Sequence, residues 1–161
     1  MSSEHSPSPQ NPSSRNEMEN GIPVITYSRN VFLPLTFVCR NTCGYCTFRQ
    51  DPGPGCIMTP VEVERSLALG QAAGCTEALF TFGEHPQEVK GFLPLLQDAG
   101  YSSILEYCRA MSVRAIDNTL LPHTNAGILS AEEMELLRPY NASMGLMLET
   151  TANIPAHRGS P

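Results

Sequence analysis

The sequence contains no tryptophan, no cluster of basic residues and no long apolar run. Its formal net charge is -6, whereas nucleic-acid-binding chains usually gather Lys and Arg on one surface. No segment reaches the roughly 18 apolar residues that a membrane-spanning helix needs. The first 20 residues are polar and rich in Ser, Pro and Asn, without the apolar centre of a secretion signal. These absences favour a cytoplasmic, soluble protein with neither a nucleic-acid nor a membrane partner.

The 161 residues are enough for one domain with a hydrophobic core. Residues 1–22 have the composition of a disordered tail. Beyond them, apolar runs predict strands at residues 31–38, 77–82, 119–122 and 142–148, and helical patterns predict helices near 60–73, 86–99, 103–115 and 130–138. Repeated strand-helix alternation predicts an α/β fold with a parallel sheet or a βα barrel.

Four strands are too few to close a barrel, because closure couples strand number, tilt and shear. Residues 23–161 are therefore expected to form the first four βα units of a partial βα barrel, incomplete at its C-terminal side. A complete small flavodoxin-like sheet is the alternative. Three helix starts carry a capping box, in which a hydroxyl and a Glu three residues later cap each other. They are Thr59 with Glu62, Ser103 with Glu106, and Ser130 with Glu133.

Three cysteines follow the first predicted strand with the spacing C-x3-C-x2-C: Cys39, Cys43 and Cys46. Three thiolates can bind three irons of a 4Fe-4S cluster, which leaves the fourth iron open to a substrate or cofactor. A structural zinc site is the main alternative, with Cys56 as a possible fourth ligand, although no second CxxC pair exists. A disulfide framework is a weaker alternative, because it belongs mainly to small exported proteins.

The remaining cysteines, Cys75 and Cys108, are interpreted with Cys56 as ordinary small hydrophobic residues. Met144 and Met147 are interpreted as core residues of the fourth strand. Arg49, just after the cysteine loop, is interpreted as a surface charge.

Further polar candidates follow the other predicted strands. Phe82-Gly83-Glu84 ends the second strand, His123 and Asn125 follow the third, and Glu149 ends the fourth. The chemistry of βα barrels lies at the carboxyl ends of the strands, so these residues are expected on the same rim as the cysteines. For each one, an ordinary strand-ending turn or surface position is the alternative, and a lone His is more often structural.

The C-x3-C-x2-C motif after a first strand resembles the signature of the radical S-adenosylmethionine (SAM) superfamily. This resemblance implies a 4Fe-4S cluster on Cys39, Cys43 and Cys46 whose fourth iron binds SAM. It also implies that Phe82, Gly83 and Glu84 receive the SAM ammonium, that Glu149 binds the ribose hydroxyls, and that Tyr45 packs near the adenine. His123 and Asn125 are further candidates for contacting SAM or substrate. No residue is assigned as catalytic.

Longer strings narrow the resemblance. They include residues 27–36, 43–49, 75–84, 121–127 and 142–149, and they resemble subunit 1 of FO synthase, the 7,8-didemethyl-8-hydroxy-5-deazariboflavin synthase family, over about residues 24–161. This resemblance implies a carbon-nitrogen lyase of coenzyme F(420) biosynthesis. It implies hydrogen abstraction from a hydroxybenzyl adduct of ribityl-diaminouracil, followed by ring closure to the deazaflavin FO and release of ammonia.

The same resemblance implies a companion FO synthase subunit or fused domain, and a reductant such as ferredoxin or flavodoxin. The alternatives are the companion subunit itself, a biotin-synthase-like enzyme, and a non-catalytic zinc-binding module.

Overall fold

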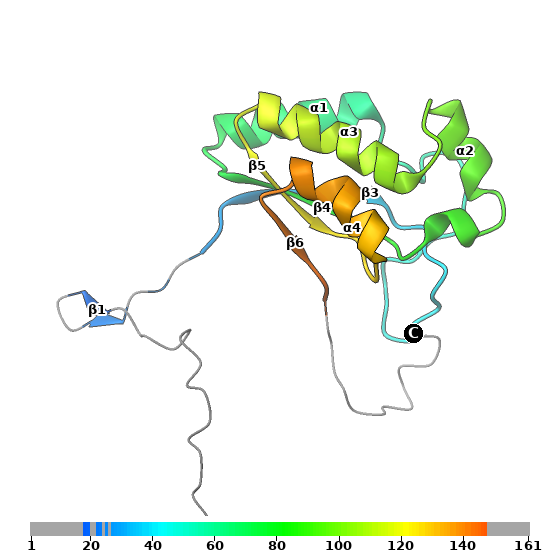
Figure 1. The fold of residues 1–161 in the computed structure, drawn as a ribbon, viewed down its shortest axis with the longest axis horizontal. Helices are drawn as coiled ribbons and strands as arrows, with labels where there is room; N and C mark the ends of the chain where they lie inside the picture. Colours follow the sequence, from blue (N-terminus) through cyan, green and yellow to red (C-terminus); the bar gives the residue numbers. More distant parts are fainter. Residues whose placement is uncertain (1–17, 20–21, 24, 26, 148–161) are drawn as a thin grey trace, which may run out of the picture.

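Four parallel strands form the main sheet of the computed structural model, which describes residues 18–19, 22–23, 25 and 27–147. The strands are β3 (Asn30–Thr36), β4 (Glu77–Phe82), β5 (Leu121–Asn125) and β6 (Ser143–Gly145). They lie side by side in chain order, β3-β4-β5-β6 (Figure 1). A separate antiparallel pair, β1 (Met18–Glu19) and β2 (Ile22–Pro23), precedes the sheet within or beside the stretch predicted as a tail.

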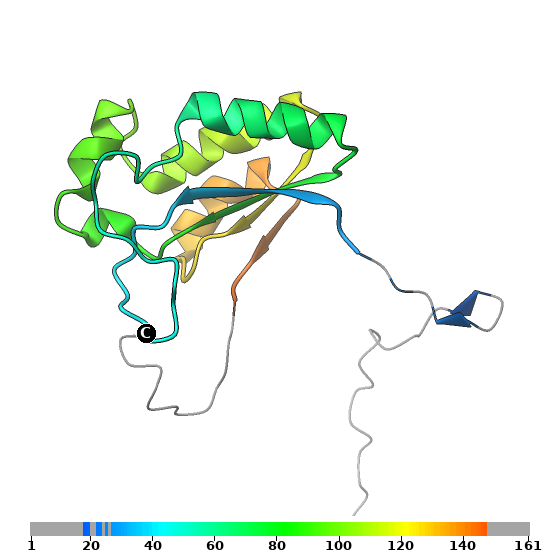
Figure 2. The same cartoon turned by 180° about the vertical axis from the view of Figure 1, so that it is seen from behind.

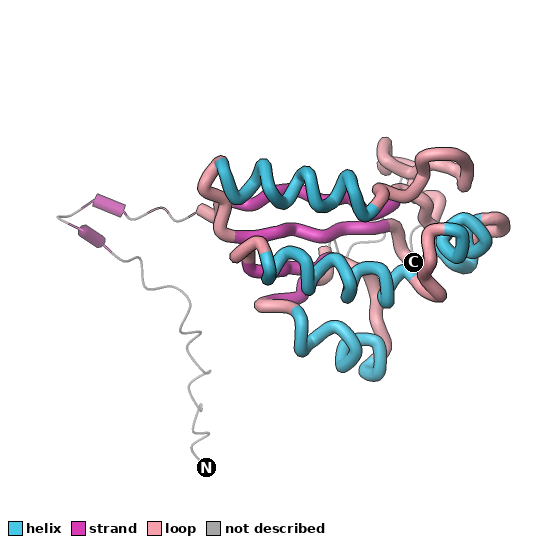
Figure 3. The backbone as a smooth tube through the Cα atoms, turned by 90° about the horizontal axis from the view of Figure 1, so that it is seen from above, coloured by secondary structure: helices cyan, strands magenta, loops and turns pink. Residues whose placement is uncertain are grey.

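The main helices cover one face of this sheet. They are α1 (Pro60–Ala72), α3 (Ile104–Asp117) and α4 (Ala131–Leu137), while α2 (Phe92–Asp98) lies beyond the strand ends. Two 3-10 turns, η2 (Pro86–Glu88) and η3 (Arg138–Tyr140), complete the described elements. Opposite views place these helices on the same side of the strands, and the view from above shows α1, α3 and α4 lying along them (Figures 2 and 3).

This arrangement confirms the α/β prediction and rejects the flavodoxin-like alternative. A flavodoxin-like sheet reverses its strand order and carries helices on both faces. Here the order follows the chain without reversal, and in the described part of the chain the second sheet face carries no helix.

The hydrophobic core lies between the sheet and its helices. Leu33, Leu35, Ala78 and Phe80 are fully buried because successive residues of a strand point to opposite faces, and these four point toward the helices. Phe32 points the other way and is 51% exposed. The helix-free face is therefore partly apolar and open to a ligand.

The helix starts follow the predicted capping chemistry in two of three cases. Thr59 with Glu62, and Ser130 with Glu133, form complete capping boxes at α1 and α4. At α3 the Ser103 hydroxyl accepts from the Glu106 backbone as predicted, but the Glu106 carboxylate accepts from Ser102 instead. The third box is therefore only half correct, because a second serine stands directly before the cap.

The third strand begins later than predicted. Thr119 has a positive φ of 59° and belongs to the turn that ends α3, so β5 starts at Leu121. As a result His123 and Asn125 lie within β5 rather than after it. The looser helical segment at residues 86–99 is divided into η2 and α2, with Gly91 at a φ of 93° between them.

Among the described residues, none of the helices combines the length and the apolar character that crossing a membrane requires.

Candidate functional site

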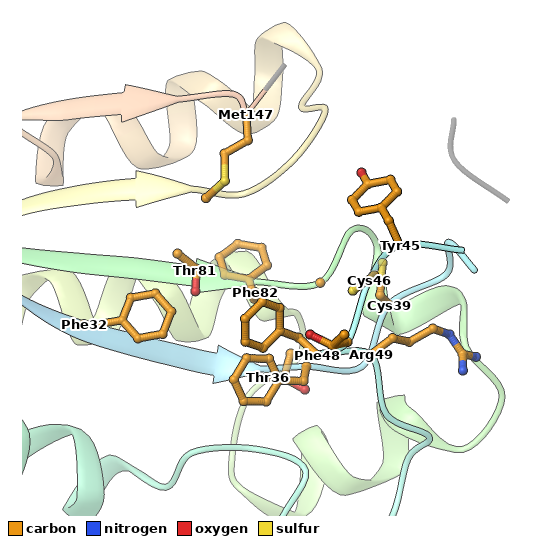
Figure 4. Close-up of a pocket in the computed structure, with 13 residues that line it drawn as sticks. Phe32, Thr36, Cys39, Tyr45, Cys46, Phe48, Arg49, Thr81, Phe82 and Met147 are labelled. Carbon is orange, nitrogen blue, oxygen red and sulfur yellow. The ribbon is translucent and has the colours of Figure 1, made fainter. Parts of the chain in front are cut away.

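A cavity of about 450 Å³ opens where β3 and β4 end and the cysteine loop begins (Figure 4). Pockets that bind small molecules and cofactors typically fall between about 300 and 1,000 Å³. Five of the residues predicted for cluster or SAM binding line this cavity: Cys39, Tyr45, Cys46, Phe82 and Gly83. The remaining lining residues are four apolar ones, Phe32, Phe37, Phe48 and Met147, and four polar ones, Thr36, Thr47, Arg49 and Thr81.

The cysteine loop is closed at its base. The backbone N–H of Gln50 donates to the carbonyl of Phe37 at 3.2 Å, and the rings of Phe37 and Phe48 stack with centroids 5.7 Å apart. Within the loop, the N–H of Cys46 donates to the carbonyl of Cys43 at 3.1 Å, which makes a tight turn between the second and third cysteines. The loop is therefore a compact unit that follows β3.

Two of the three predicted cluster ligands reach the same cavity. Cys39 and Cys46 line it, and Figure 4 shows their sulfurs at its cysteine-loop end. Cys43 is half-buried on the same turn and is not among the lining residues. None of the six cysteines forms a disulfide, so the disulfide framework is rejected. Across the described ranges, no three His, Cys, Asp or Glu side chains are arranged as a metal site.

The donor set nevertheless fits an iron-sulfur cluster. Three thiols within one short loop, beside a cavity of this size, provide the soft ligands that iron-sulfur clusters use. The zinc alternative is weaker, because Cys56 is 5% exposed, packs in the core cluster and does not itself line the cavity.

Gly83 stands against the backbone of the cysteine loop. A Cβ built on Gly83 would lie 2.0 Å from the Val38 carbonyl oxygen and 2.7 Å from the Cys39 Cβ. Glycine was expected here because it allows SAM to approach the backbone. In the structure, the backbone just before Cys39 already lies against Gly83. The glycine therefore first allows the end of β4 to pack against that segment.

Glu84 does not line the cavity. Its side chain is 9% exposed, and one carboxylate oxygen accepts from Arg40 Nη2 at 2.8 Å. Its backbone N–H donates to Cys39 Sγ at 3.2 Å. The hydrogen bond from Arg40 to Glu88, and then that to Glu84, raises the pKa of Arg40 above its ordinary value and outweighs the loss of hydration. Arg40 itself was not predicted as a site residue.

His123 and Asn125 lie on the helix-free face, since their neighbours Pro122 and Thr124 are buried on the other side. His123 Nδ1 lies 2.5 Å from the Ser143 hydroxyl, and Nε2 lies 3.3 Å from Asn125 Oδ1. This polar group is separate from the cavity lining. The prediction that it contacts SAM or substrate stays a prediction.

Other predicted residues have simpler outcomes. Glu149 lies outside the described residues, so its predicted ribose contact stays a prediction. Met144 packs against the core as expected, but Met147 is 63% exposed and lines the cavity, because β6 ends at Gly145. Arg49 pairs with the exposed Asp51 at 3.2 Å while its stem lines the cavity.

The two buried cysteines behave as predicted. Cys56 and Cys108 both belong to the core, and burial raises the pKa of Cys108 to about 11. A thiol with such a high pKa is a poor metal ligand and a poor nucleophile at neutral pH.

Sequence reasoning missed the aromatic base of the loop and the ion pair between Arg40 and Glu84. Both join residues that are distant in the sequence, the second across a separation of 44 positions. The sequence does place opposite charges next to two motif residues: Arg40 directly follows Cys39, and Glu84 directly follows Gly83. It becomes specific only when β3 and β4 are placed side by side.

Comparison with known proteins places this geometry in context. No family model matches the chain. Proteins named 7,8-didemethyl-8-hydroxy-5-deazariboflavin synthase match it at 67% identity over 137 residues in Methanoregula boonei, 62% over 137 in Methanosphaerula palustris and 59% over 138 in Methanoculleus marisnigri. These matches include 85 to 86% of this chain. The chain spans 42% of the length of each of these curated relatives. The resemblance predicted from the motifs is confirmed.

Proposed function

Because this chain is related to the 7,8-didemethyl-8-hydroxy-5-deazariboflavin synthases over 85% of its length, we propose that it is part of a radical SAM enzyme of coenzyme F(420) biosynthesis. The observation that carries the proposal is the C-x3-C-x2-C loop beside a cavity that two of its thiols and Gly83 line. The relatives indicate the family, and the cysteine loop carries the residues proposed to bind the iron-sulfur cluster.

The proposed architecture is the first part of a radical SAM βα barrel. Strands in chain order with helices on one face are the arrangement expected of consecutive barrel units. The helix-free face, which carries Phe32, His123 and Asn125, would then be the barrel interior. Active sites of such barrels lie at the carboxyl ends of the strands, which is where the cavity lies.

Cys39, Cys43 and Cys46 are the proposed ligands of a 4Fe-4S cluster. When bound, such a cluster with one open iron supplies the electron that cleaves SAM reductively. Tyr45, Phe82 and Gly83 are proposed to hold the SAM molecule, since they share the cavity with two of the thiols. Glu149 is carried over from the family pattern as a further SAM contact. The family pattern gives Glu84 the same role, but Glu84 does not line the cavity and its carboxylate already accepts from Arg40.

The cavity offers a mainly apolar surface to a ligand. The stacked Phe37 and Phe48 rings form one wall. Phe48 and Met147 are both more than half exposed, so a bound ligand would cover this apolar surface. The ring of Tyr45 is 46% exposed at the cavity mouth, so it can pack on a planar base.

The proposed reaction is that of a carbon-nitrogen lyase. It takes a hydroxybenzyl adduct of ribityl-diaminouracil, abstracts hydrogen, closes the central ring to FO and releases ammonia. A companion FO synthase subunit or fused domain would supply the adduct, and a reductant such as ferredoxin or flavodoxin would supply the electron. The product matches the relatives' printed name. The lyase class, the adduct, the companion subunit and the reductant rest on the family resemblance alone.

Metal analysis with cysteine variants tests the proposal. Anaerobic reconstitution of the chain should give iron and sulfide in nearly equal amounts, and Cys39→Ala, Cys43→Ala or Cys46→Ala should each abolish the cluster. The matched control is Cys75→Ala, which removes a half-buried thiol outside the loop and should retain it. Zinc without sulfide, or equal loss with Cys75→Ala, would contradict the proposal and favour the zinc-binding module.

A further inference from the structure

We infer that Arg40 and Glu84 form a latch that positions Cys39 for cluster binding, and that Glu84 acts through this latch rather than by contacting SAM. This inference rests on the proposed function, because it concerns how the chain holds the cluster. Arg40 and Glu84 are positioning residues, called below the Arg40–Glu84 latch.

The backbone carries the first part of the latch. Glu84 donates its N–H to Cys39 Sγ at 3.2 Å and accepts the Arg40 N–H on its carbonyl at 2.9 Å. The N–H of Gly83 donates to the Thr36 carbonyl at 3.1 Å. The end of β4 is thus joined to the chain on both sides of the first cysteine, and the Cys39 sulfur is fixed relative to the sheet.

The side chains carry the second part. Arg40 Nη2 donates to Glu84 Oε1 at 2.8 Å, and Asn41 Nδ2 lies 3.5 Å from the other carboxylate oxygen. Glu84 is the one charged residue that is buried in the described part of the chain. A buried carboxylate is stable only with a counter-charge and hydrogen bonds, and Arg40 supplies both. The carboxylate is therefore already occupied.

Arg40 has a second and more exposed partner. Its Nη1 donates to the Glu88 carboxylate at 3.2 Å, but the Glu88 side chain is 52% exposed. Breaking an exposed ion pair costs little stability, whereas removing the partner of a buried carboxylate leaves an uncompensated charge and costs more. The contact with Glu84 therefore determines where the latch holds the loop.

The hydrogen bond to Cys39 Sγ has a consequence for redox chemistry. Hydrogen bonds to the sulfurs of an iron-sulfur cluster raise its reduction potential by stabilising the extra negative charge of the reduced state. Opening the latch lets the Glu84 amide move away from the sulfur. The reduction potential should then become more negative, which a change in fold stability alone would not cause.

The test compares Arg40→Ala, Glu84→Gln and the double variant with the unaltered chain after anaerobic reconstitution. The readouts are the rate of iron release to a chelator, the reduction potential, and the dissociation constant for SAM. The matched control is Arg138→Ala, which removes the exposed ion pair with Glu135 at 2.9 Å, far from the cysteine loop in sequence.

We expect Arg40→Ala and Glu84→Gln each to speed iron release by roughly tenfold, as for loss of one charge-assisted hydrogen bond. The double variant should release iron no faster than either single variant, because both remove the same contact. The reduction potential should fall in both Arg40→Ala and Glu84→Gln. Arg40→Lys should show smaller changes in iron release and in potential than Arg40→Ala. Arg138→Ala should behave as the unaltered chain. If Arg40→Ala does not fold, Glu84→Gln and Arg40→Lys carry the same comparison.

A direct role of Glu84 in binding SAM gives a different pattern. Glu84→Gln would then weaken SAM binding while Arg40→Ala left it unchanged or tightened it, and neither would alter iron release or potential. That result would overturn the latch while leaving the proposed function intact. Failure of the unaltered chain to bind an iron-sulfur cluster would instead overturn the proposed function.

Discussion

Replacing Gly83 with alanine should destabilise both the fold and the cysteine loop. The added Cβ would lie 2.0 Å from the Val38 carbonyl oxygen and 2.7 Å from the Cys39 Cβ. Real Cβ contacts are not this short. The nearest obstructing atom is a backbone oxygen and the other is a Cβ, and neither can turn aside as the end of a flexible side chain can. The end of β4 and the entry to the cysteine loop must therefore separate.

The cost should lie at or above about 3 kcal/mol, the upper end of what overpacking costs in a folded core. The separation also breaks the contact that holds Cys39, so cluster loading should fall together with stability. Gly53→Ala is the matched control, because a Cβ there meets nothing within 4 Å.

Urea unfolding followed by circular dichroism gives the stability difference, and iron content after anaerobic reconstitution gives the loading. We expect a large loss of both for Gly83→Ala and little change for Gly53→Ala. A Gly83→Ala chain as stable as the Gly53→Ala control, with a full complement of iron, would show that Gly83 is not needed for this close packing.

Three further predictions concern the rest of the fold. Thr59→Ala should destabilise the chain by about 1 kcal/mol in urea unfolding through loss of the α1 cap, whereas Thr59→Ser should not; equal effects would contradict the capping role. Hydrogen bonds from the Thr59 hydroxyl and backbone lower the pKa of Glu62, so its stabilising contribution is present above the ordinary glutamate pKa and is lost as the pH falls through the lowered value. The stability difference between the chain and Glu62→Gln should therefore shrink in acid, and a difference that grows would contradict it. Iodoacetamide at pH 8 should label the exposed Cys46 well before the buried Cys108, whose pKa is about 11, as peptide mass spectrometry can measure; simultaneous labelling would contradict the packing.

Local chemistry explains why most elements could be predicted. The strand Glu77–Phe82 was predicted with its observed ends, since it is an apolar run between polar residues. The caps at Thr59 and Ser130 were predicted because a capping box involves residues only three positions apart. Interactions between residues this close in the sequence can be recognised from the sequence alone.

The errors arise where the local pattern is ambiguous. The start of β5 was misplaced because Thr119 adopts a positive φ, which β-branched residues rarely do. Met147 was taken as core because it continues an apolar run, although β6 ends at Gly145 and leaves it 63% exposed.

The candidate site was only half predictable for a similar reason. The cysteine spacing and Gly83 could be recognised as motifs, and the structure brings them together at one cavity. The ion pair of Arg40 with Glu84 could not, because it depends on the register of two strands that pair across the sheet. The contacts that hold the cysteine loop in place are tertiary, whereas the proposed cysteine ligands lie close together in the sequence.

We propose that this chain holds an iron-sulfur cluster with one iron open to SAM. The most direct measurement is the EPR spectrum of the reduced, anaerobically reconstituted chain with and without SAM. We expect a 4Fe-4S signal that changes when SAM is added, because SAM would occupy the open iron. A signal that SAM leaves unchanged, or no iron-sulfur signal at all, would contradict it.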